Sequence, residues 1–168
     1  MRKNILINVY GTRQALSNPY TGVLAIFASR LMNDVAPLIF EDGNQQRDFV
    51  HVRDVATACR LAMEAPESSH CVFNIGSGRA CTIREIARRM AAALGKQHIH
   101  ASITQTYRVG DIRHCYADIT LAGEILGYEP RMPLEWGLEE LTNWLAGQQA
   151  LHRVAEARAQ LDSRGLAI

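Results

Sequence analysis

The chain has 168 residues, and its 18 Lys and Arg against 17 Asp and Glu leave a formal net charge of +1. A nearly neutral chain has no overall field to hold nucleic acid or an anionic membrane, so neither is an expected partner. No apolar run approaches the roughly 18–20 residues of a membrane-spanning helix, and the apolar stretch near Met1 is too short for a signal peptide. These observations predict a cytoplasmic protein of one domain with a substantial core.

The first third of the chain predicts three strands and one helix. The apolar, β-branched run Asn4–Gly11 is typical of a buried strand, and a polar loop follows it. A helical period spans Gly22–Asn33. Short strands are expected at Pro37–Phe40 and Arg47–Val52, on either side of a turn-rich segment.

In the rest of the chain, predicted strands again alternate with predicted helices. Asp54 is placed to cap a helix whose apolar stripe runs from Val55 to Met63. The remaining expected elements are a buried strand at Cys71–Gly76, a helix opened by a capping box at Thr82–Glu85, a short strand at Ile99–Ile103, and helices at Asp118–Gly127 and Leu134–Leu145. This alternation predicts an α/β fold with a largely parallel sheet.

The four cysteines, at positions 59, 71, 81 and 115, form no C-x-x-C pair and have no histidine at metal-ligand spacing. We expect small, buried or half-buried thiols in a reducing compartment, and we assign no metal-binding residue.

The turn Gly76-Ser77-Gly78 lies between a strand and a capped helix, the setting of a dinucleotide-binding fingerprint. Cys81 stands at the third glycine position, and no acidic residue follows the strand at 99–103 to grip a ribose. We therefore favour a tight strand-to-helix turn over the fingerprint, although its backbone amides could still face a ligand.

Two groups of charged residues suit a phosphate. Arg47 lies behind a glycine-containing turn and could present its two-pronged guanidinium to an anion, although spacing alone favours an ion pair with Asp48 or Asp54. Arg108 precedes Asp111 by three residues across a glycine, so one loop wall could carry both side chains. A solvated loop is the alternative interpretation.

Taken in order, five segments resemble the C-terminal half of the extended short-chain dehydrogenase/reductase family, the NAD-dependent sugar-nucleotide epimerases and dehydratases. The segments are Asn8–Gly11, Gln46–Ala56, Phe73–Gly78, Tyr107–Asp111 and Leu126–Pro130.

The resemblance implies a Rossmann-like fold with a small substrate-binding subdomain. Residues 1–147 would form its C-terminal, substrate-binding portion, and the polar residues 148–168 would form a helical tail. Gln14–Gly22 and Ser163–Leu166 are most similar to 4-epimerases of nucleoside-diphosphate sugars such as dTDP-L-rhamnose.

The resemblance also implies a binding site for a dTDP- or UDP-linked sugar. Its residues would be Asn8 on the sugar diphosphate, Thr21 and Gly22 beside the substrate, Leu38 and Phe40 along the base, Arg47 and Arg108 on the two phosphates, and Asp111 on the ribose. The family context thus favours the phosphate role over the ion pair for Arg47.

The catalytic features of the family have no counterpart in these residues. No tyrosine is followed by lysine four positions later, no G-x-x-G-x-x-G opens the chain, and Thr12 stands where relatives carry proline. The proton transfer of an epimerase needs that tyrosine, its pKa lowered by the lysine. We therefore assign no catalytic or NAD-binding residue, and we expect the chain alone to be inactive and to hold NAD weakly.

Two other functions stay open. The first strand, Asn4–Tyr10, would normally lie inside a larger sheet, so the chain could be a non-catalytic interaction module. It would pair through that strand with a missing N-terminal half or with its own copy, as a homodimer. The second alternative is a fragment of a nucleotide-sugar 4,6-dehydratase.

Overall fold

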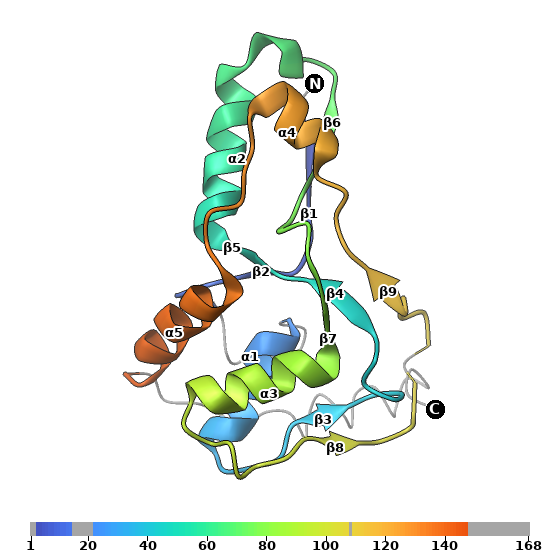
Figure 1. The fold of residues 1–168 in the computed structure, drawn as a ribbon, viewed down its shortest axis with the longest axis vertical. Helices are drawn as coiled ribbons and strands as arrows, with labels where there is room; N and C mark the ends of the chain where they lie inside the picture. Colours follow the sequence, from blue (N-terminus) through green and yellow to red (C-terminus); the bar gives the residue numbers. More distant parts are fainter. Residues whose placement is uncertain (1–2, 15–21, 108, 148–168) are drawn as a thin grey trace.

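The computed structural model describes residues 3–14, 22–107 and 109–147 (Figure 1). The predicted tail 148–168 and two predicted site residues, Thr21 and Arg108, lie outside the described residues. In the described part, no helix is long and apolar enough to span a membrane.

Short strands pair mainly in parallel. Strand β1 (Lys3–Leu6) pairs with β6 (Val72–Ile75), β2 (Val9–Tyr10) with β5 (Val50–His51), and β3 (Leu38–Ile39) with β8 (Ser102–Ile103), all in parallel. Strand β4 (Gln46–Asp48) lies between β9 (His114–Cys115), to which it is parallel, and β7 (Ala80–Thr82), to which it is antiparallel.

The five predicted helices are present. They are α1 (Val23–Met32), α2 (Val52–Glu64), α3 (Ile83–Ala93), α4 (Thr120–Leu126) and α5 (Leu134–Leu145), with a short 3-10 helix, η1, at Pro66–Ser68. The Thr82 hydroxyl caps α3 by accepting a hydrogen bond from the Glu85 amide at 3.1 Å. The α/β class, with parallel strands among helices, is confirmed.

The buried side chains form two clusters. One lies among α1, α3 and α5 and includes Phe27 and Leu141; the other lies among α2, α4 and β6 and includes Phe73. In Figure 1 the second group of elements stands above the first, and β4 and β5 cross between them. The core is therefore divided along the long axis of the molecule.

The prediction of one buried strand at Asn4–Gly11 is wrong in two respects. Asn8 has a φ of 40° and separates β1 from β2, so Asn4–Gly11 does not form one strand. Ile5 and Leu6 are 50% and 45% exposed, so β1 is not buried. Among the described residues β1 pairs with β6 alone, and both strands of this pair carry exposed apolar side chains. Strand β6 is likewise only half-buried, with its side chains alternately buried and exposed.

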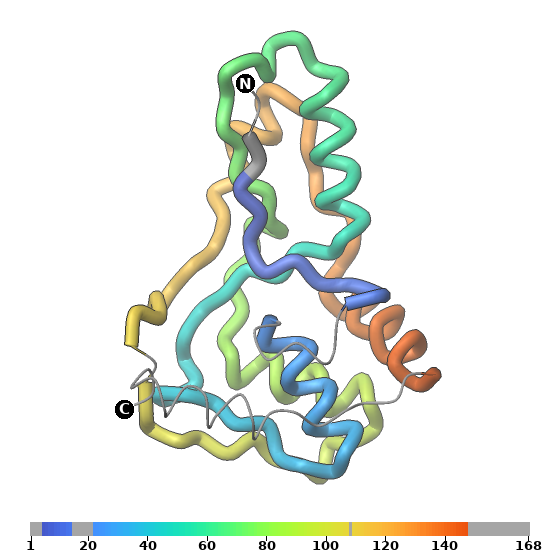
Figure 2. The backbone as a smooth tube through the Cα atoms, turned by 180° about the vertical axis from the view of Figure 1, so that it is seen from behind, coloured from blue at the N-terminus to red at the C-terminus, as the bar shows by residue number. Residues whose placement is uncertain are grey.

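Strand β2 connects the start of the chain to its last helix. Figure 2 shows the first segment, in dark blue, ending beside α5. A Cβ on Gly137 of α5 would lie 2.1 Å from the Tyr10 hydroxyl oxygen, so Tyr10 packs where only glycine leaves room. This contact fixes β2 against the lower core.

Asp54 does not cap helix α2, contrary to the sequence-based prediction. The helix begins at Val52, and the Nδ1 atom of His51 accepts the capping hydrogen bond from the Arg53 amide at 3.3 Å. Asp54 lies in the first turn, where its carboxylate accepts hydrogen bonds from the amides of Arg131 and Met132 at 3.1 and 3.0 Å. It thereby ties the loop before α5 to α2.

Candidate functional site

The glycine turn at 76–78 is filled by a side chain of the protein. The buried Asp48 carboxylate accepts hydrogen bonds from the Ser77 and Gly78 amides at 2.8 and 2.9 Å, and from the Ser77 hydroxyl at 2.5 Å. A Cβ on Gly76 would lie 2.5 Å from the same carboxylate. The turn is tight, but it leads from β6 into strand β7 and not directly into helix α3, so the predicted strand-to-helix turn is confirmed only in part. The Ser77 and Gly78 amides face Asp48 and not a ligand. This turn does not fit a dinucleotide pyrophosphate.

Arg47 faces the other side of strand β4 and holds the segment before β9. Its Nη1 atom donates to the carbonyls of Gln46 and Arg113, both at 2.9 Å. Its Nη2 atom donates to the Ile112 carbonyl at 2.5 Å and pairs with the Asp111 carboxylate at 3.2 Å. The Arg47 side chain is 14% exposed, whereas that of Asp111 is 40% exposed.

The structure thus brings together two predicted site residues that are 64 positions apart in the sequence, Arg47 and Asp111. The alternative ion pair of Arg47 with Asp48 or Asp54 is wrong, because both carboxylates accept from backbone amides on other segments. The position of Arg108 relative to this pair lies outside the described residues.

An apolar strand lies shortly before Arg47 in the sequence. Leu38 and Phe40 are half-buried on either side of Ile39, which is 1% exposed. Because successive side chains of an extended segment point to opposite faces, Leu38 and Phe40 share the face opposite Ile39. The Phe40 carbonyl accepts a hydrogen bond from Gln45 Nε2 at 2.7 Å, which folds the turn back toward β4.

Asn8 and Gly22 are less closely connected to the site. The Asn8 side-chain amide donates to the Asp48 carbonyl at 3.0 Å, so Asn8 lies beside β4. Gly22 is the exposed N-cap of α1. Among the described residues, no hydrogen bond or ion pair joins either of them to Arg47 or Asp111.

Three charged residues at this edge were not assigned from the sequence. Arg113 pairs with Glu41 at 2.5 Å and with Asp42 at 2.8 Å. The hydrogen bond from the Arg113 guanidinium holds the pKa of Asp42 well below its usual range. A depression of about 480 Å³ adjoins these side chains and includes Arg84 and Ile103. Since the partners are about 70 positions apart, only the fold reveals them.

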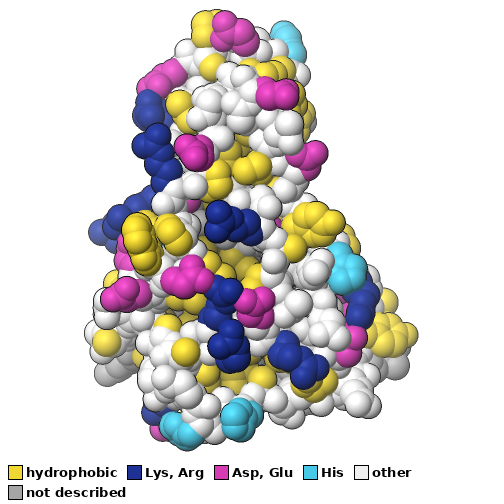
Figure 3. Space-filling model, in the orientation of Figure 1, with side chains coloured by type: hydrophobic (Ala, Val, Ile, Leu, Met, Phe, Trp, Pro, Cys, Tyr) yellow, Lys and Arg dark blue, Asp and Glu magenta, His cyan; other side chains and the backbone are white. Residues whose placement is uncertain are grey.

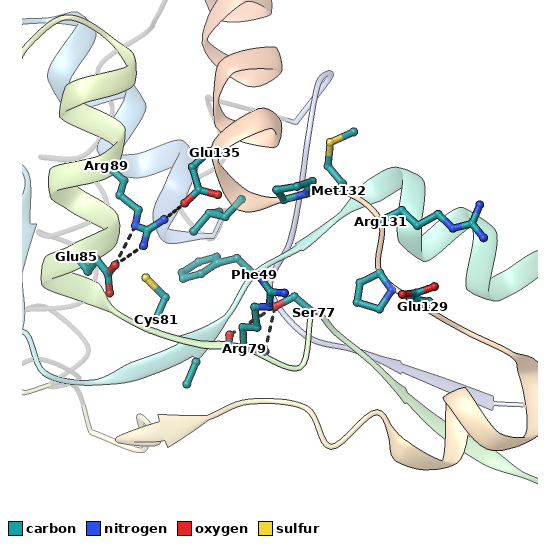
Figure 4. Close-up of a pocket in the computed structure, with 14 residues that line it drawn as sticks. Phe49, Ser77, Arg79, Cys81, Glu85, Arg89, Glu129, Arg131, Met132 and Glu135 are labelled. Atoms are coloured by element: carbon teal, nitrogen blue, oxygen red, sulfur yellow. Dashed lines mark hydrogen bonds and ion pairs between the residues drawn. The ribbon is translucent and has the colours of Figure 1, made fainter.

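A second depression, of about 370 Å³, contains none of the predicted site residues. Figure 4 shows Arg89 between Glu85 and Glu135 on one side of it, and the Arg131 guanidinium pointing away from it. Burial raises the pKa of the Cys81 thiol to about 11, so this thiol stays protonated at neutral pH. Three basic and three acidic residues line the depression, which does not favour an anionic ligand: Arg79, Arg89, Arg131, Glu85, Glu129 and Glu135. The face drawn in Figure 3 likewise carries both kinds of side chain interspersed.

Comparisons with known proteins agree with the sequence resemblance. The family model described as NAD dependent epimerase/dehydratase matches residues 4–76. The chain is 41% identical over 143 residues to dTDP-L-rhamnose 4-epimerase of Burkholderia thailandensis, a match that covers 84% of this chain and 38% of that protein.

Solved structures show the same relationship. UDP-glucose 4-epimerase of Thermotoga maritima, crystallised with UDP-glucose, has a TM-score of 0.76 at 35% identity, covering 85% of this chain and 45% of its own. UDP-glucuronic acid 4-epimerase of Bacillus cereus, in complex with UDP-glucuronic acid and NAD, has a TM-score of 0.75 at 26% identity, covering 85% and 44%.

The chain therefore spans less than half the length of each of these relatives. The comparisons confirm the predicted resemblance to NAD-dependent nucleotide-sugar epimerases, over a part of each, and the Rossmann-like extended fold.

Proposed function

Because the chain is related to NAD-dependent epimerases and dehydratases, we propose that it is the nucleotide-sugar-binding part of a sugar-nucleotide 4-epimerase. The observation that carries the proposal is the pairing of Arg47 with Asp111 at 3.2 Å. The segment that carries Asp111 is also hydrogen-bonded to Ile39 and Glu41, next to Leu38 and Phe40. The UDP-glucose present in the Thermotoga maritima structure indicates the class of ligand.

Each group of this site has a chemical match in a nucleoside diphosphate. The base lies along the apolar face of Leu38 and Phe40. A phosphate takes the Arg47 Nη2 N–H groups that point to Asp111 and Ile112, because charge-assisted hydrogen bonds from a guanidinium to phosphate oxygens are strong. When the phosphate takes the place of Asp111 on Arg47, the Asp111 carboxylate accepts a hydrogen bond from a ribose hydroxyl.

The other predicted residues complete this site. Arg108 holds the second phosphate, and Asn8, Thr21 and Gly22 border the sugar. These roles rest on the resemblance, and the position of Asn8 beside β4 is compatible with them.

The chemical step needs groups that these 168 residues do not contain. They hold no Tyr-x-x-x-Lys pair and no G-x-x-G-x-x-G turn, and Asp48 occupies the amides of the glycine turn that follows β6. In the intact family, NAD takes up a hydride from C4 of the sugar and returns it. We propose that this chain by itself binds the nucleotide sugar, holds NAD weakly and does not catalyse that exchange.

Calorimetric titration with dTDP and UDP tests the proposal. The unaltered chain should bind at least one of them, and the double variant Arg47→Ala, Arg108→Ala should lose about tenfold or more in affinity, because charge-assisted contacts to phosphate are removed. Arg60→Ala, Arg88→Ala removes two exposed arginines of α2 and α3 and serves as the matched control. Equal heats for the unaltered chain and the Arg47, Arg108 variant would contradict the proposed function.

A second function, an interaction module, is favoured by the edge of β1 that no strand in the described part of the chain covers. Ile5, Leu6 and Val72 are each close to half exposed on the β1–β6 pair, and an exposed apolar edge strand is a template for pairing with another chain. We propose that β1 pairs with the remaining portion of the family fold or, in its absence, with a second copy of this chain.

Sedimentation velocity over a hundredfold range of concentration tests the self-pairing. We expect a dimer that dissociates on dilution and is lost in Ile5→Lys, since a buried unpaired charge is costly. The exposed Met63 of α2 provides the control Met63→Lys, which should leave the dimer intact. A monomer at every concentration would exclude pairing between copies.

A further inference from the structure

The segment between β8 and β9 carries two residues of the proposed site, Arg108 and Asp111, and the role assigned below rests on that proposed function. At its described positions, 104–107 and 109–113, the segment has no helix or strand of its own, so contacts with its neighbours determine where it lies. The question is which contacts hold it in register with Arg47.

Backbone hydrogen bonds fix the start of the segment to the turn after β3. The Thr104 amide donates to the Ile39 carbonyl at 2.9 Å, and the Glu41 amide donates to the Thr106 carbonyl at 2.7 Å. The Gln105 amide returns to the Glu41 carbonyl at 3.2 Å. Glu41 and Gln105 both have positive φ, at 52° and 57°, a conformation that residues other than glycine adopt only where the surroundings impose it.

Arg113 fixes the other end of the segment, with both its side chain and its backbone. Its guanidinium spans Glu41 at 2.5 Å and Asp42 at 2.8 Å, in the same turn after β3. Its carbonyl accepts hydrogen bonds from the Gln46 amide at 3.2 Å and from Arg47 Nη1 at 2.9 Å. One residue therefore joins the turn, strand β4 and the end of the segment.

We propose that Arg113 is a positioning residue for nucleotide binding. Arg113 holds the end of the segment against the same turn to which backbone hydrogen bonds join its start. It thereby places the Asp111 carboxylate at the Arg47 guanidinium and keeps the segment beside β3. Its single positive charge also offsets part of the negative charge of Glu41 and Asp42, two carboxylates that repel a diphosphate near Arg47.

A double-mutant cycle on dTDP or UDP affinity tests this role. Arg113→Ala should weaken binding about fivefold to tenfold. Asp111→Asn should weaken it by a similar factor in the unaltered chain, but by less than twofold in the Arg113→Ala background, because a displaced Asp111 no longer contacts the ribose. A loss of stability alone would not make the two effects non-additive.

The conservative variant keeps the cycle interpretable. Arg113→Lys retains the charge without the two-pronged geometry, so its affinity should lie between those of the unaltered chain and Arg113→Ala. If Arg113→Ala does not fold, as judged by circular dichroism, Arg113→Lys replaces it in the cycle. Arg60→Ala is the matched arginine control, since its ion pair with Glu64 at 2.6 Å lies within α2. Unchanged affinity in the Arg113 variant, or fully additive losses, would overturn the role.

Failure of the proposed function is separable from failure of this role. If neither nucleotide binds the unaltered chain, the proposed function is wrong, and amide hydrogen exchange then measures the positioning directly. Exchange at residues 109–115 that is about tenfold faster in Arg113→Ala, with unchanged exchange in α2, supports a positioning role. Unchanged exchange at 109–115 overturns it.

Discussion

Two adjacent residues of strand β4, Arg47 and Asp48, form contrasting networks on opposite faces of one strand. Asp48 is fully buried and holds the glycine turn through the backbone amides of Ser77 and Gly78. Arg47 lies near the surface and holds a partly exposed carboxylate, Asp111. Bonds to backbone amides cannot be exchanged without unfolding the turn, whereas a side-chain ion pair can give its donors to a ligand. Strand β4 therefore carries one residue that fixes the fold and one residue that can exchange its partner for a ligand.

The largest expected effect on stability comes from replacing Asp48. Asp48→Ala leaves the amides of Ser77, Gly78 and Ala117 without their acceptor, and we expect a loss of about 3 kcal/mol or more in the free energy of unfolding. Urea denaturation measures it. Asp111→Ala is the matched control and should cost much less, because Asp111 is an exposed partner. Similar losses for both variants would remove the distinction between the two faces.

An intermediate effect on stability is expected from protonation of His51, which lies in β5. Burial lowers the pKa of His51, although the Glu140 carboxylate 3.8 Å away opposes the shift. The unfolded chain takes up a proton near the ordinary pKa of about 6.5, whereas the folded chain resists it, so stability should fall as the pH drops below about 6.5.

The variant His51→Asn isolates that pH dependence. Asparagine can still accept the capping hydrogen bond at the start of α2 but does not titrate. Thermal unfolding between pH 5 and pH 8 should therefore show a shallower decline for His51→Asn than for the unaltered chain. Parallel curves would show that protonation of His51 is not linked to folding.

The smallest expected effect on stability comes from replacing Arg113, whose carbonyl accepts a hydrogen bond from Arg47. Arg113→Ala removes two surface ion pairs, and such pairs contribute little to folding because water and salt screen them. The small loss in stability should disappear in 1 M NaCl, where the screening length is about 3 Å. A loss that persists at high salt would mean that Arg113 is structural in the same sense as Asp48.

The helices could be predicted from the sequence because their signals are local. The apolar stripe of α3 and its Thr82 cap lie within a dozen residues, and the structure places both as expected. The roles of the acidic residues could not be predicted in this way. Asp48 and Asp54 look like surface ion-pair partners in the sequence, and only the fold brings them to amides 29 and 77 positions away.

Only part of the candidate site could be predicted, because its contacts also join residues that are far apart in the sequence. The resemblance selected Arg47 and Asp111, and the structure places them in contact. It did not select Arg113 or Glu41, because their pairing depends on the course of the segment before β9. The break at Asn8 was missed because asparagine tolerates a left-handed conformation without any change in hydrophobic pattern.

The parallel pairing of β1 with β6 also has a consequence for the order of folding. Lys3 is in register with Val72, so β1 cannot pair with β6 until 69 further residues have been made. At about 5–20 residues per second, synthesis of that stretch takes roughly 3 to 14 seconds. Throughout this interval Ile5 and Leu6 lack the strand that β6 later provides, so these apolar side chains are accessible to a nascent-chain chaperone.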